Sequence, residues 1–312
     1  MTRLLAKGGN YGIVVALVVL FVVLALTSDV FLTSRNIHNI LYQWSAEGII
    51  AMGLTVLIVS GEFDLSVGAL FAVASVVTAK VGMSAAPGVA LAAACMCGVA
   101  VGLMNGLMVT VLRINSFIAT LAMSIALGGL AVILSDQQIL TVTRPGFGSL
   151  ATSEFLGLKL TVWFFFVALA LISVFLHRGV FGRKVFAVGG NAEAARLAGV
   201  QVSFVRLQCF VLVGVATGLA AFLTTSAVST AQAESGGFTL LFTVFTAIVV
   251  GGTSIAGGVG AIWRTVVGLA LLALVGNGFT LLAIDSSYQA LIYAGLIVAA
   301  VSLDIWGKPR TT

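Results

Sequence analysis

Two carboxylates interrupt a long run of apolar residues in the segment Gly61-Glu62-Phe63-Asp64-Leu65-Ser66-Val67-Gly68. An ionised side chain beside so much apolar sequence is costly unless it is hydrated, paired or used to cap a helix. Asp64 is well placed to cap a helix that begins at Leu65, because its charge there meets free backbone N–H groups and the positive end of the helix dipole. We therefore expect a turn between two helices. The alternatives are that Asp64 contacts the hydroxyl groups of a solute or makes a gate contact.

Other polar side chains in apolar surroundings are the remaining candidates for contact with a polar solute. Amide and hydroxyl groups bind hydroxyl-rich molecules, but they also form hydrogen bonds between membrane helices. We expect packing to be the main role of the asparagines and a solvated loop to surround the glutamine. The candidate solute pathway consists of Asp64, Ser66, Asn105, Asn277 and Gln232.

The sequence offers little for catalysis or for nucleotide binding. His38 and His177 have no Ser or Cys nucleophile and carboxylate arranged around them, and no G-x-x-x-x-G-K-[ST] pattern is present to hold nucleotide phosphates. Cys95 and Cys97 lie in apolar sequence without a histidine or further cysteine nearby, which indicates packing and not a metal site. We predict no catalytic residue, no bound cofactor and no metal on this chain, and we expect that it is not an enzyme.

The elements that must position these residues are membrane helices. Of 312 residues, 60% are hydrophobic and 8% are charged, against roughly 25% charged in an average soluble domain. Apolar runs of about 20 residues, long enough to cross a bilayer, recur throughout. We predict an all-α polytopic membrane protein that forms one transmembrane domain over residues 1–312. About ten spans are expected, at 11–27, 45–60, 65–83, 88–112, 115–134, 161–177, 205–229, 239–256, 260–283 and 288–305.

The connections between these spans carry the basic residues, so the formal charge of +5 indicates topology and not nucleic-acid binding. The polar segment 28–44, which contains Tyr42 and Trp44, is expected to be a separate helix at the membrane interface. With the N-terminus inside, the expected spans place 11 of the 15 basic residues inside. This distribution predicts that both termini lie in the cytoplasm. The inside set is Arg3, Lys7, Arg113, Arg178, Arg183, Lys184, Arg196, Arg206, Arg264, Lys308 and Arg310, and the outside set is Arg35, Lys80, Arg144 and Lys159.

The longest basic connection, at about 178–204, is predicted to be a cytoplasmic loop that contains a short helix. Asn191 is a good N-cap residue, Ala192–Leu197 favours helix, and Gly199 can end it. Such a helix is a suitable docking element for a partner protein. We expect Asp at Ala194 or Ala195 to uncouple transport from ATP hydrolysis while leaving membrane insertion intact. The docking candidates are Arg183, Lys184, Gly189, Gly190, Asn191, Ala194, Ala195, Arg196 and Gly199.

Glycines mark two tight joins at which the chain must turn within or just below the membrane. Ile58-Val59-Ser60-Gly61 resembles Ile248-Val249-Val250-Gly251, which suggests an internal duplication of the kind found in transporters. The glycines expected to break and pack helices are Gly61, Gly68, Gly251, Gly252, Gly257, Gly258 and Gly260.

Four stretches in the same order resemble the permease subunits of bacterial ABC importers for sugars of the ribose, xylose and galactose type. They are Ser60–Gly68, Arg113–Leu121, Gly182-Arg183 with Ala187–Val200, and Gly251–Gly260. Two departures stand out: Glu62 replaces a small residue of the first stretch, and 239–243 lacks two carboxylates that the family usually has there.

The resemblance implies a permease fold and an importer made of several chains in the bacterial inner membrane. The implied partners are a cytoplasmic ABC ATPase that carries ATP and Mg²⁺, a periplasmic solute-binding protein and a second permease subunit, all working in the lipid bilayer. The solute would be a sugar, polyol or related small polar molecule. The alternative is a self-sufficient secondary transporter or channel. Too few ionisable residues lie within the spans for a convincing proton relay, which disfavours ion coupling.

Overall fold

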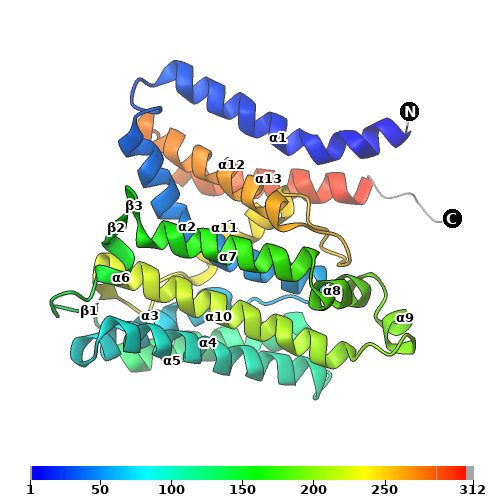
Figure 1. The fold of residues 1–312 in the computed structure, drawn as a ribbon, viewed down its shortest axis with the longest axis horizontal. Coiled ribbons are helices and arrows are strands. Elements are labelled where there is room, and N and C mark those ends of the chain that lie inside the picture. Colours follow the sequence, from blue (N-terminus) through cyan, green and yellow to red (C-terminus); the bar gives the residue numbers. More distant parts are fainter. Residues whose placement is uncertain (1, 286, 307–312) are drawn as a thin grey trace.

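The computed structural model describes residues 2–285 and 287–306, and most of these are helical (Figure 1). The helices are α1 (Thr2–Thr27), α2 (Ser34–Val59), α3 (Val67–Ser84), α4 (Pro87–Thr110), α5 (Ser116–Ser135), α6 (Ser149–Thr152), α7 (Leu160–His177), α8 (Val180–Gly190), α9 (Ala192–Leu197), α10 (Val202–Val228), α11 (Gly237–Val250), α12 (Ile262–Leu281) and α13 (Ser287–Trp306). Four two-residue strands, β1 (Leu140–Thr141), β2 (Glu154–Phe155), β3 (Leu158–Lys159) and β4 (Thr230–Ala231), form the antiparallel pairs β1–β4 and β2–β3.

Within residues 2–285 and 287–306, seven helices are long and apolar enough to cross a membrane, namely α2, α3, α4, α5, α7, α10 and α12. Three shorter apolar helices accompany them, at Gly12–Thr27, Gly237–Val250 and Ser287–Ala299. This composition defines a helical, multi-pass membrane protein. The total of about ten spans stays a prediction, because the three shorter helices fall below the length that marks a span.

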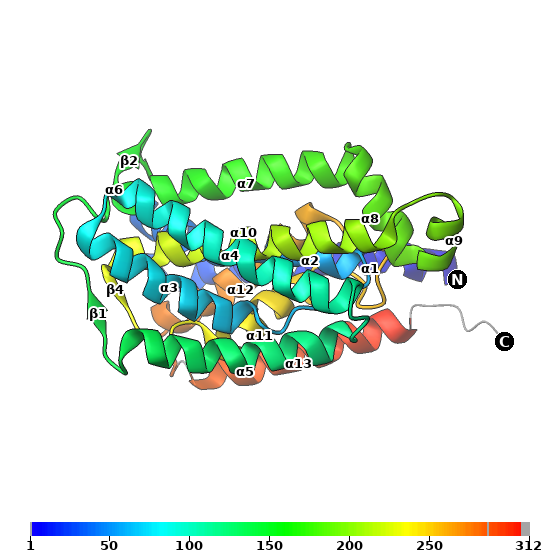
Figure 2. The same ribbon diagram turned by 90° about the horizontal axis from the view of Figure 1, so that it is seen from below.

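The long helices lie side by side, and their connections gather at two ends (Figures 1 and 2). One end, here called the strand end, carries α6 and the strands. The opposite end, called the α9 end, carries α8 and α9 together with the start of α1 and the last described turn of α13 (Figure 2). The arrangement therefore separates the connections of the chain into two groups, as expected for a bundle that crosses a bilayer.

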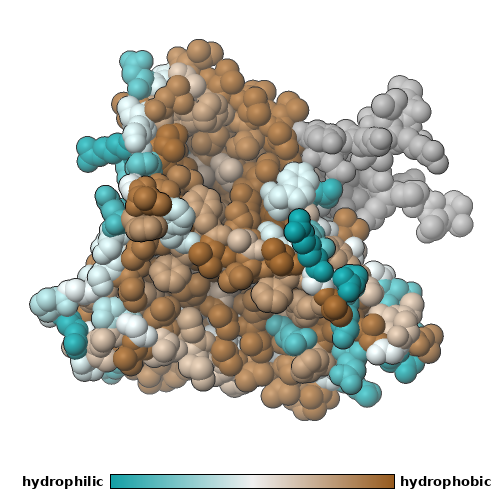
Figure 3. Space-filling view, in the orientation of Figure 1, coloured by the Kyte–Doolittle hydropathy of each residue, from teal (hydrophilic) through white to brown (hydrophobic). Residues whose placement is uncertain are grey.

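Apolar side chains cover the flank of the bundle between its two polar ends (Figure 3). α2 is largely buried inside the protein, whereas α4, α5 and α7 leave most of their apolar surface exposed. Exposed side chains such as Ile125, Ile133 and Phe175 suit contact with lipid acyl chains. A bilayer is thus the environment in which this surface is satisfied.

Glycines allow α4 and α10 to approach until their backbones touch. A Cβ atom on Gly98 would overlap the carbonyl oxygen of Gly214, and a Cβ atom on Gly214 would overlap that of Gly98. One turn along α4, a Cβ on Gly102 would lie 2.6 Å from the carbonyl oxygen of Phe210. Close packing of this kind stabilises membrane helix pairs, because lipid supplies no hydrophobic force between them.

Replacing Gly214 with alanine is expected to destabilise the protein by about 1–3 kcal/mol, the usual cost of overpacking a dense core. The matched control is Gly129→Ala in α5, since a Cβ atom there would have no neighbour within 4 Å. Thermal unfolding in detergent should show a lower midpoint for Gly214→Ala and no loss for Gly129→Ala. Equal midpoints for the two variants would contradict the close approach of α4 and α10.

The expected boundary between an interfacial helix at 28–44 and a span beginning at 45 is wrong. α2 runs without interruption from Ser34 to Val59, and the Thr33 hydroxyl caps it by accepting a hydrogen bond from the N–H of Asn36. Polar residues in its first turns are tolerated because Asn36 is buried in hydrogen bonds with Phe31 and with α12. Asn36 therefore takes part in helix packing, whereas Arg35, His38, Asn39 and Gln43 of the same stretch are exposed.

α11 begins inside the bundle and not at the strand end. A Cβ atom on Gly68 would overlap the carbonyl oxygen of Gly237, so the first residue of α11 lies against the first turn of α3. With 14 residues, α11 is about 21 Å long, which is shorter than the roughly 30 Å hydrocarbon core of a bilayer. The connection from β4 to α11 accordingly runs back along α3 before the helix starts (Figure 2).

Candidate functional site

Two short helices at the α9 end carry the predicted docking residues. Asn191 lies between α8 and α9 and caps α9, since its Oδ1 accepts a hydrogen bond from the N–H of Ala194 at 2.9 Å. Gly199 ends α9 with φ at 82°, a left-handed conformation that glycine adopts without strain. The N–H of Val200 then bonds to the Ala195 carbonyl at 3.0 Å. Both ends of the predicted helix are thus confirmed.

The two faces of α9 differ in exposure. Ala195 is buried, with 5% of its surface exposed, and anchors α9 to the protein. Ala194 is exposed, and Leu197 is 76% exposed although it is apolar. Ala194 and Leu197 are three residues apart and so share one face of the helix. Leu197 was not among the predicted docking residues, although an apolar residue in a basic polar loop is a usable signal.

Both short helices also carry charged side chains. Arg183 and Lys184 are exposed on α8. On α9, Arg196 forms a bidentate ion pair with Glu193, with N–O distances of 2.6 and 3.0 Å. The bond from Arg196 lowers the pKa of the Glu193 carboxyl, and Glu193 raises the pKa of Arg196, so both remain charged around neutral pH. α9 therefore presents one apolar strip beside a fixed pair of opposite charges.

The last turn of α8 packs against the end of α2 through backbone atoms. A Cβ atom on Gly189 would overlap the carbonyl oxygen of Val59 and would lie 2.7 Å from the nitrogen of Gly258. By contrast, a Cβ atom on Gly190 would have no neighbour within 4 Å. Only the first of these two adjacent glycines is therefore required by packing.

The loop between α11 and α12 completes this contact. Gly258 donates its N–H to the carbonyl oxygen of Val59 at 2.8 Å. A Cβ atom on Gly257 would lie 2.9 Å from the Cα of Gly61 and 3.0 Å from the carbonyl oxygen of Gly189. We call this meeting of Val59, Gly61, Gly189, Gly257 and Gly258 the glycine junction. It joins three segments that are far apart in the sequence.

Three further glycines that were expected to break helices lie in the connection between α11 and α12. Gly252 has φ at 85°, in the left-handed region. A Cβ atom on Gly251 would lie 2.5 Å from the carbonyl oxygen of Arg264, and one on Gly260 would lie 2.6 Å from a methyl carbon of Val59. These residues thus pack the α11–α12 loop onto α12 and α2.

Three of the five candidate pathway residues meet in a buried polar cluster. Asp64 Oδ1 accepts hydrogen bonds from the N–H and the hydroxyl of Ser66 at 2.8 and 2.6 Å. The Asn105 amide donates to Asp64 Oδ2 at 3.2 Å and to the Ser66 hydroxyl at 2.8 Å. None of the three is more than 4% exposed. In this conformation the cluster is closed and its members bind one another.

The predicted capping role of Asp64 needs correction. α3 begins at Val67 and not at Leu65, and Asp64 closes a turn with Ser66 ahead of it. The segment is also bonded to α5, because the N–H groups of Phe63 and Leu65 donate hydrogen bonds to the hydroxyls of Ser116 and Thr120. Asp64 lies between these two anchored residues and is itself held by Ser66 and by the Asn105 amide of α4.

The remaining two candidates lie elsewhere. Asn277 forms a reciprocal amide pair with Asn36, with N–O distances of 3.1 and 2.8 Å, which ties α12 to the start of α2. Gln232 is exposed just after β4, at the strand end. The structure does not bring either residue to the buried cluster.

One acidic residue within a span, Glu47, was not among the predicted site residues. Glu47 lies near the middle of α2, and its Oε2 is buried without a hydrogen-bond partner in the part of the chain that the structure describes. A lone carboxyl in such a position is unusual in a membrane helix. Its isolation between apolar residues was a signal that the sequence did offer.

The structure defines a helical membrane bundle with two short helices, α8 and α9, at one end. Comparison with known proteins identifies its family. Residues 36–301 match the family described as the permease component of the branched-chain amino acid transport system. The chain belongs to this family of permease components.

Individual relatives extend the match to nearly the whole chain. The L-arabinose ABC transporter permease protein AraH of Azospirillum brasilense is 37% identical over 307 residues, covering 96% of this chain and 90% of the relative. The ribose import permease protein RbsC of Escherichia coli K12 is 35% identical over 296 residues, covering 93% and 92%. RbsC of Bacillus subtilis is 34% identical over 291 residues, covering 92% and 90%. No solved structure matches.

Proposed function

We propose that this chain is the membrane-spanning permease subunit of an ABC importer that carries a sugar into the cytoplasm. The observation that carries the proposal is the match to arabinose and ribose permeases over nine-tenths of both chains. The α8–α9 loop supports it, because a permease without a nucleotide-binding pattern of its own needs a surface on which an ATPase can act.

The ATPase is proposed to dock on the exposed face of α9 that carries Ala194 and Leu197, with Arg183, Lys184 and Arg196 around it. ATP and Mg²⁺ would bind to that partner chain and not to the permease. The glycine junction would then pass movement of α8 to α2 and to the α11–α12 loop, since these backbones are already in contact.

The α9 end is proposed to face the cytoplasm of a bacterial inner membrane. The start of α1 and the last described turn of α13 lie at this end (Figure 2), and so do Arg113, Arg178, Arg183, Lys184, Arg196 and Arg206. Enrichment of basic residues on one side is the usual mark of the cytoplasmic side. A periplasmic solute-binding protein would deliver the sugar at the strand end, and a second permease subunit would complete the pathway.

The buried cluster of Asp64, Ser66 and Asn105 is proposed to act first as a lock on the segment between α2 and α3. Its hydrogen bonds are all internal, so a sugar would meet these groups only after the segment moves. Gln232 and Asn277 remain candidates for the pathway at the strand end and within α12.

Reconstitution tests this function against a self-sufficient transporter. Proteoliposomes containing the chain alone should take up neither radiolabelled L-arabinose nor D-ribose. Uptake of one of these sugars, or of a related one, should require the ATPase, ATP and the loaded binding protein together. Uptake by the chain alone would show that the alternative, a secondary transporter or channel, is correct.

A further inference from the structure

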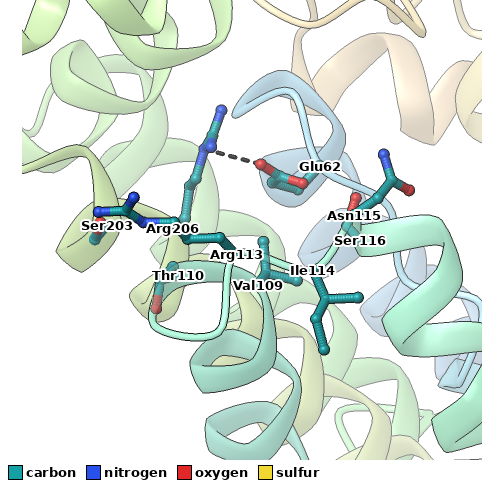
Figure 4. A pocket seen from close by; sticks show the side chains of 9 residues that line it. All are labelled: Glu62, Val109, Thr110, Arg113, Ile114, Asn115, Ser116, Ser203 and Arg206. Carbon is teal, nitrogen blue, oxygen red and sulfur yellow. Dashed lines mark ion pairs between the residues drawn. The ribbon is translucent and has the colours of Figure 1, made fainter.

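A pocket at the α9 end has no role in the proposed transport function. The turn between α4 and α5, the start of α10 and the segment after α2 enclose a pocket of about 400 Å³ (Figure 4). Its lining is mostly polar and consists of Glu62, Val109, Thr110, Arg113, Ile114, Asn115, Ser116, Ser203 and Arg206. Because it sits where three membrane-crossing helices end, it lies at the level of the lipid headgroups.

The pocket has more positive than negative charge. Two guanidinium groups, from Arg113 and Arg206, face one carboxylate, that of Glu62. The Nε of Arg206 forms an ion pair with Glu62 at 2.9 Å, which Figure 4 marks with a dashed line. Arg113 reaches instead across the opening toward Ser203, and it makes no ion pair or hydrogen bond within the described part of the chain. One positive charge is therefore left uncompensated.

The polar groups that remain free in the pocket are mainly donors. The Thr110 hydroxyl already donates to the Gly106 carbonyl, and Asn115 Oδ1 already accepts from the N–H of Phe117. The donors that remain are the Asn115 amide N–H groups, the outer N–H groups of Arg206 and the whole guanidinium of Arg113. The hydroxyls of Ser116 and Ser203 can also donate, and the Glu62 carboxylate is the acidic group of the lining. A set of donors around a net positive charge fits an anion with several acceptor oxygens, such as a phosphate group.

The backbone holds Arg113 in this position at some cost. Its φ is 59°, in the left-handed region that residues with a side chain seldom adopt. The turn between α4 and α5 therefore holds Arg113 in a backbone conformation that residues with a side chain rarely adopt on their own.

Apolar side chains extend from the rim of the pocket onto the outer surface. Val111 and Leu112 are each 65% exposed on one side of Arg113, and Phe117 and Ile118 are 53% and 61% exposed on the first turn of α5. A free anion would gain nothing from contact with these apolar side chains, whereas a phospholipid would place its acyl chains along them. Basic pockets at helix ends are a known setting for anionic headgroups.

We propose that this pocket binds the phosphate headgroup of an anionic phospholipid in the leaflet at the α9 end. Arg113 supplies the main charge, Arg206 and Asn115 supply further donors, and Glu62 limits the affinity so that exchange with bulk lipid remains possible. The proposal rests on the chain being a membrane protein and does not depend on what it transports.

The test uses the purified full-length chain in neutral detergent micelles, with phosphatidylglycerol or phosphatidylcholine of the same acyl chains added. Native mass spectrometry counts the retained lipid. The wild type should retain phosphatidylglycerol in preference, and Arg113→Asn, which suits the left-handed backbone, should weaken this retention about five-fold or more. Arg113→Lys should restore most of it, and Glu62→Gln, which keeps a partner for Arg206, should strengthen it.

Arg144→Gln at the strand end is the matched control and should retain phosphatidylglycerol as the wild type does. Arg113→Asn should unfold at the wild-type temperature in neutral detergent, which separates lost binding from lost structure. Equal retention of the two lipids by the wild type, or unchanged retention in Arg113→Asn, would overturn the proposal. So would a thermal shift with inorganic phosphate alone that matches the shift with phosphatidylglycerol, since a free anion would then suffice.

Discussion

Gly189→Ala is expected to reduce ATP-driven uptake by about ten-fold or more, whereas Gly190→Ala should leave it near the wild-type rate. A Cβ atom at position 189 would overlap the Val59 carbonyl and crowd Gly258, all backbone atoms that no side-chain rotation can move away. Overpacking of this kind costs about 1–3 kcal/mol, which corresponds to roughly a five- to hundred-fold change in the population of the packed junction.

The neighbouring glycine makes the comparison strict. Gly190 belongs to the same helical turn, has no positive φ, and a Cβ atom there would meet no neighbour. Both variants should insert into the membrane and bind the ATPase, as measured by co-purification of the complex. The measured quantity is the number of sugar molecules imported per ATP hydrolysed. A ratio that is equal in the two variants would show that the glycine junction does not transmit movement.

Leu197→Asp is expected to abolish co-purification of the ATPase and with it nearly all uptake. Leu197 is apolar and 76% exposed, so replacing it with aspartate should not disturb the packing of the fold. Truncation of a hot-spot residue at the centre of an interface costs about 2 kcal/mol or more. Aspartate at this position would in addition bury an unpaired charge in the interface. Ala194→Asp on the same face should act in the same direction.

Two controls separate docking from folding. Ala86→Asp places the same charge at the opposite end, where residue 86 precedes α4 and an N-cap aspartate is favourable, so uptake should be unchanged. Ala195→Asp should instead lower the unfolding temperature, because Ala195 is buried. If Leu197→Asp still retains the ATPase on a purification column, α9 is not the docking element.

Local signals predicted local structure well. Asn191 and Gly199 bound α9 as predicted, because capping depends on a few neighbouring residues. The same signals failed for the start of α2, where the polar residues of 34–44 suggested an interface. Asn36 is satisfied there by Asn277, which is 241 residues away, and no local pattern reveals that partner.

In the candidate site too, local features could be predicted from the sequence, whereas contacts between distant segments could not. The loop that carries Gly189 was predicted, but its contact with Val59 and Gly258 depends on where α2 and the α11–α12 loop pack. Likewise, Ala194 and Ala195 were equivalent in the sequence, and only the packing of α9 distinguishes the exposed residue from the buried one. Asp64, Ser66 and Asn105 were each singled out, yet their meeting in one closed cluster required the fold.

The glycine junction consists of backbone atoms, and this has a consequence for how transport should respond to solution conditions. Its contacts join peptide groups of Val59, Gly61, Gly189, Gly257 and Gly258, none of which carries an ionisable side chain. Neither a change of pH nor added salt can weaken it, since there is no charge to titrate or to screen. The proposed docking of the ATPase on the basic surface around α9 would involve charges. Rising ionic strength should therefore lower the affinity for the ATPase while the number of sugars imported per ATP by each assembled complex stays constant.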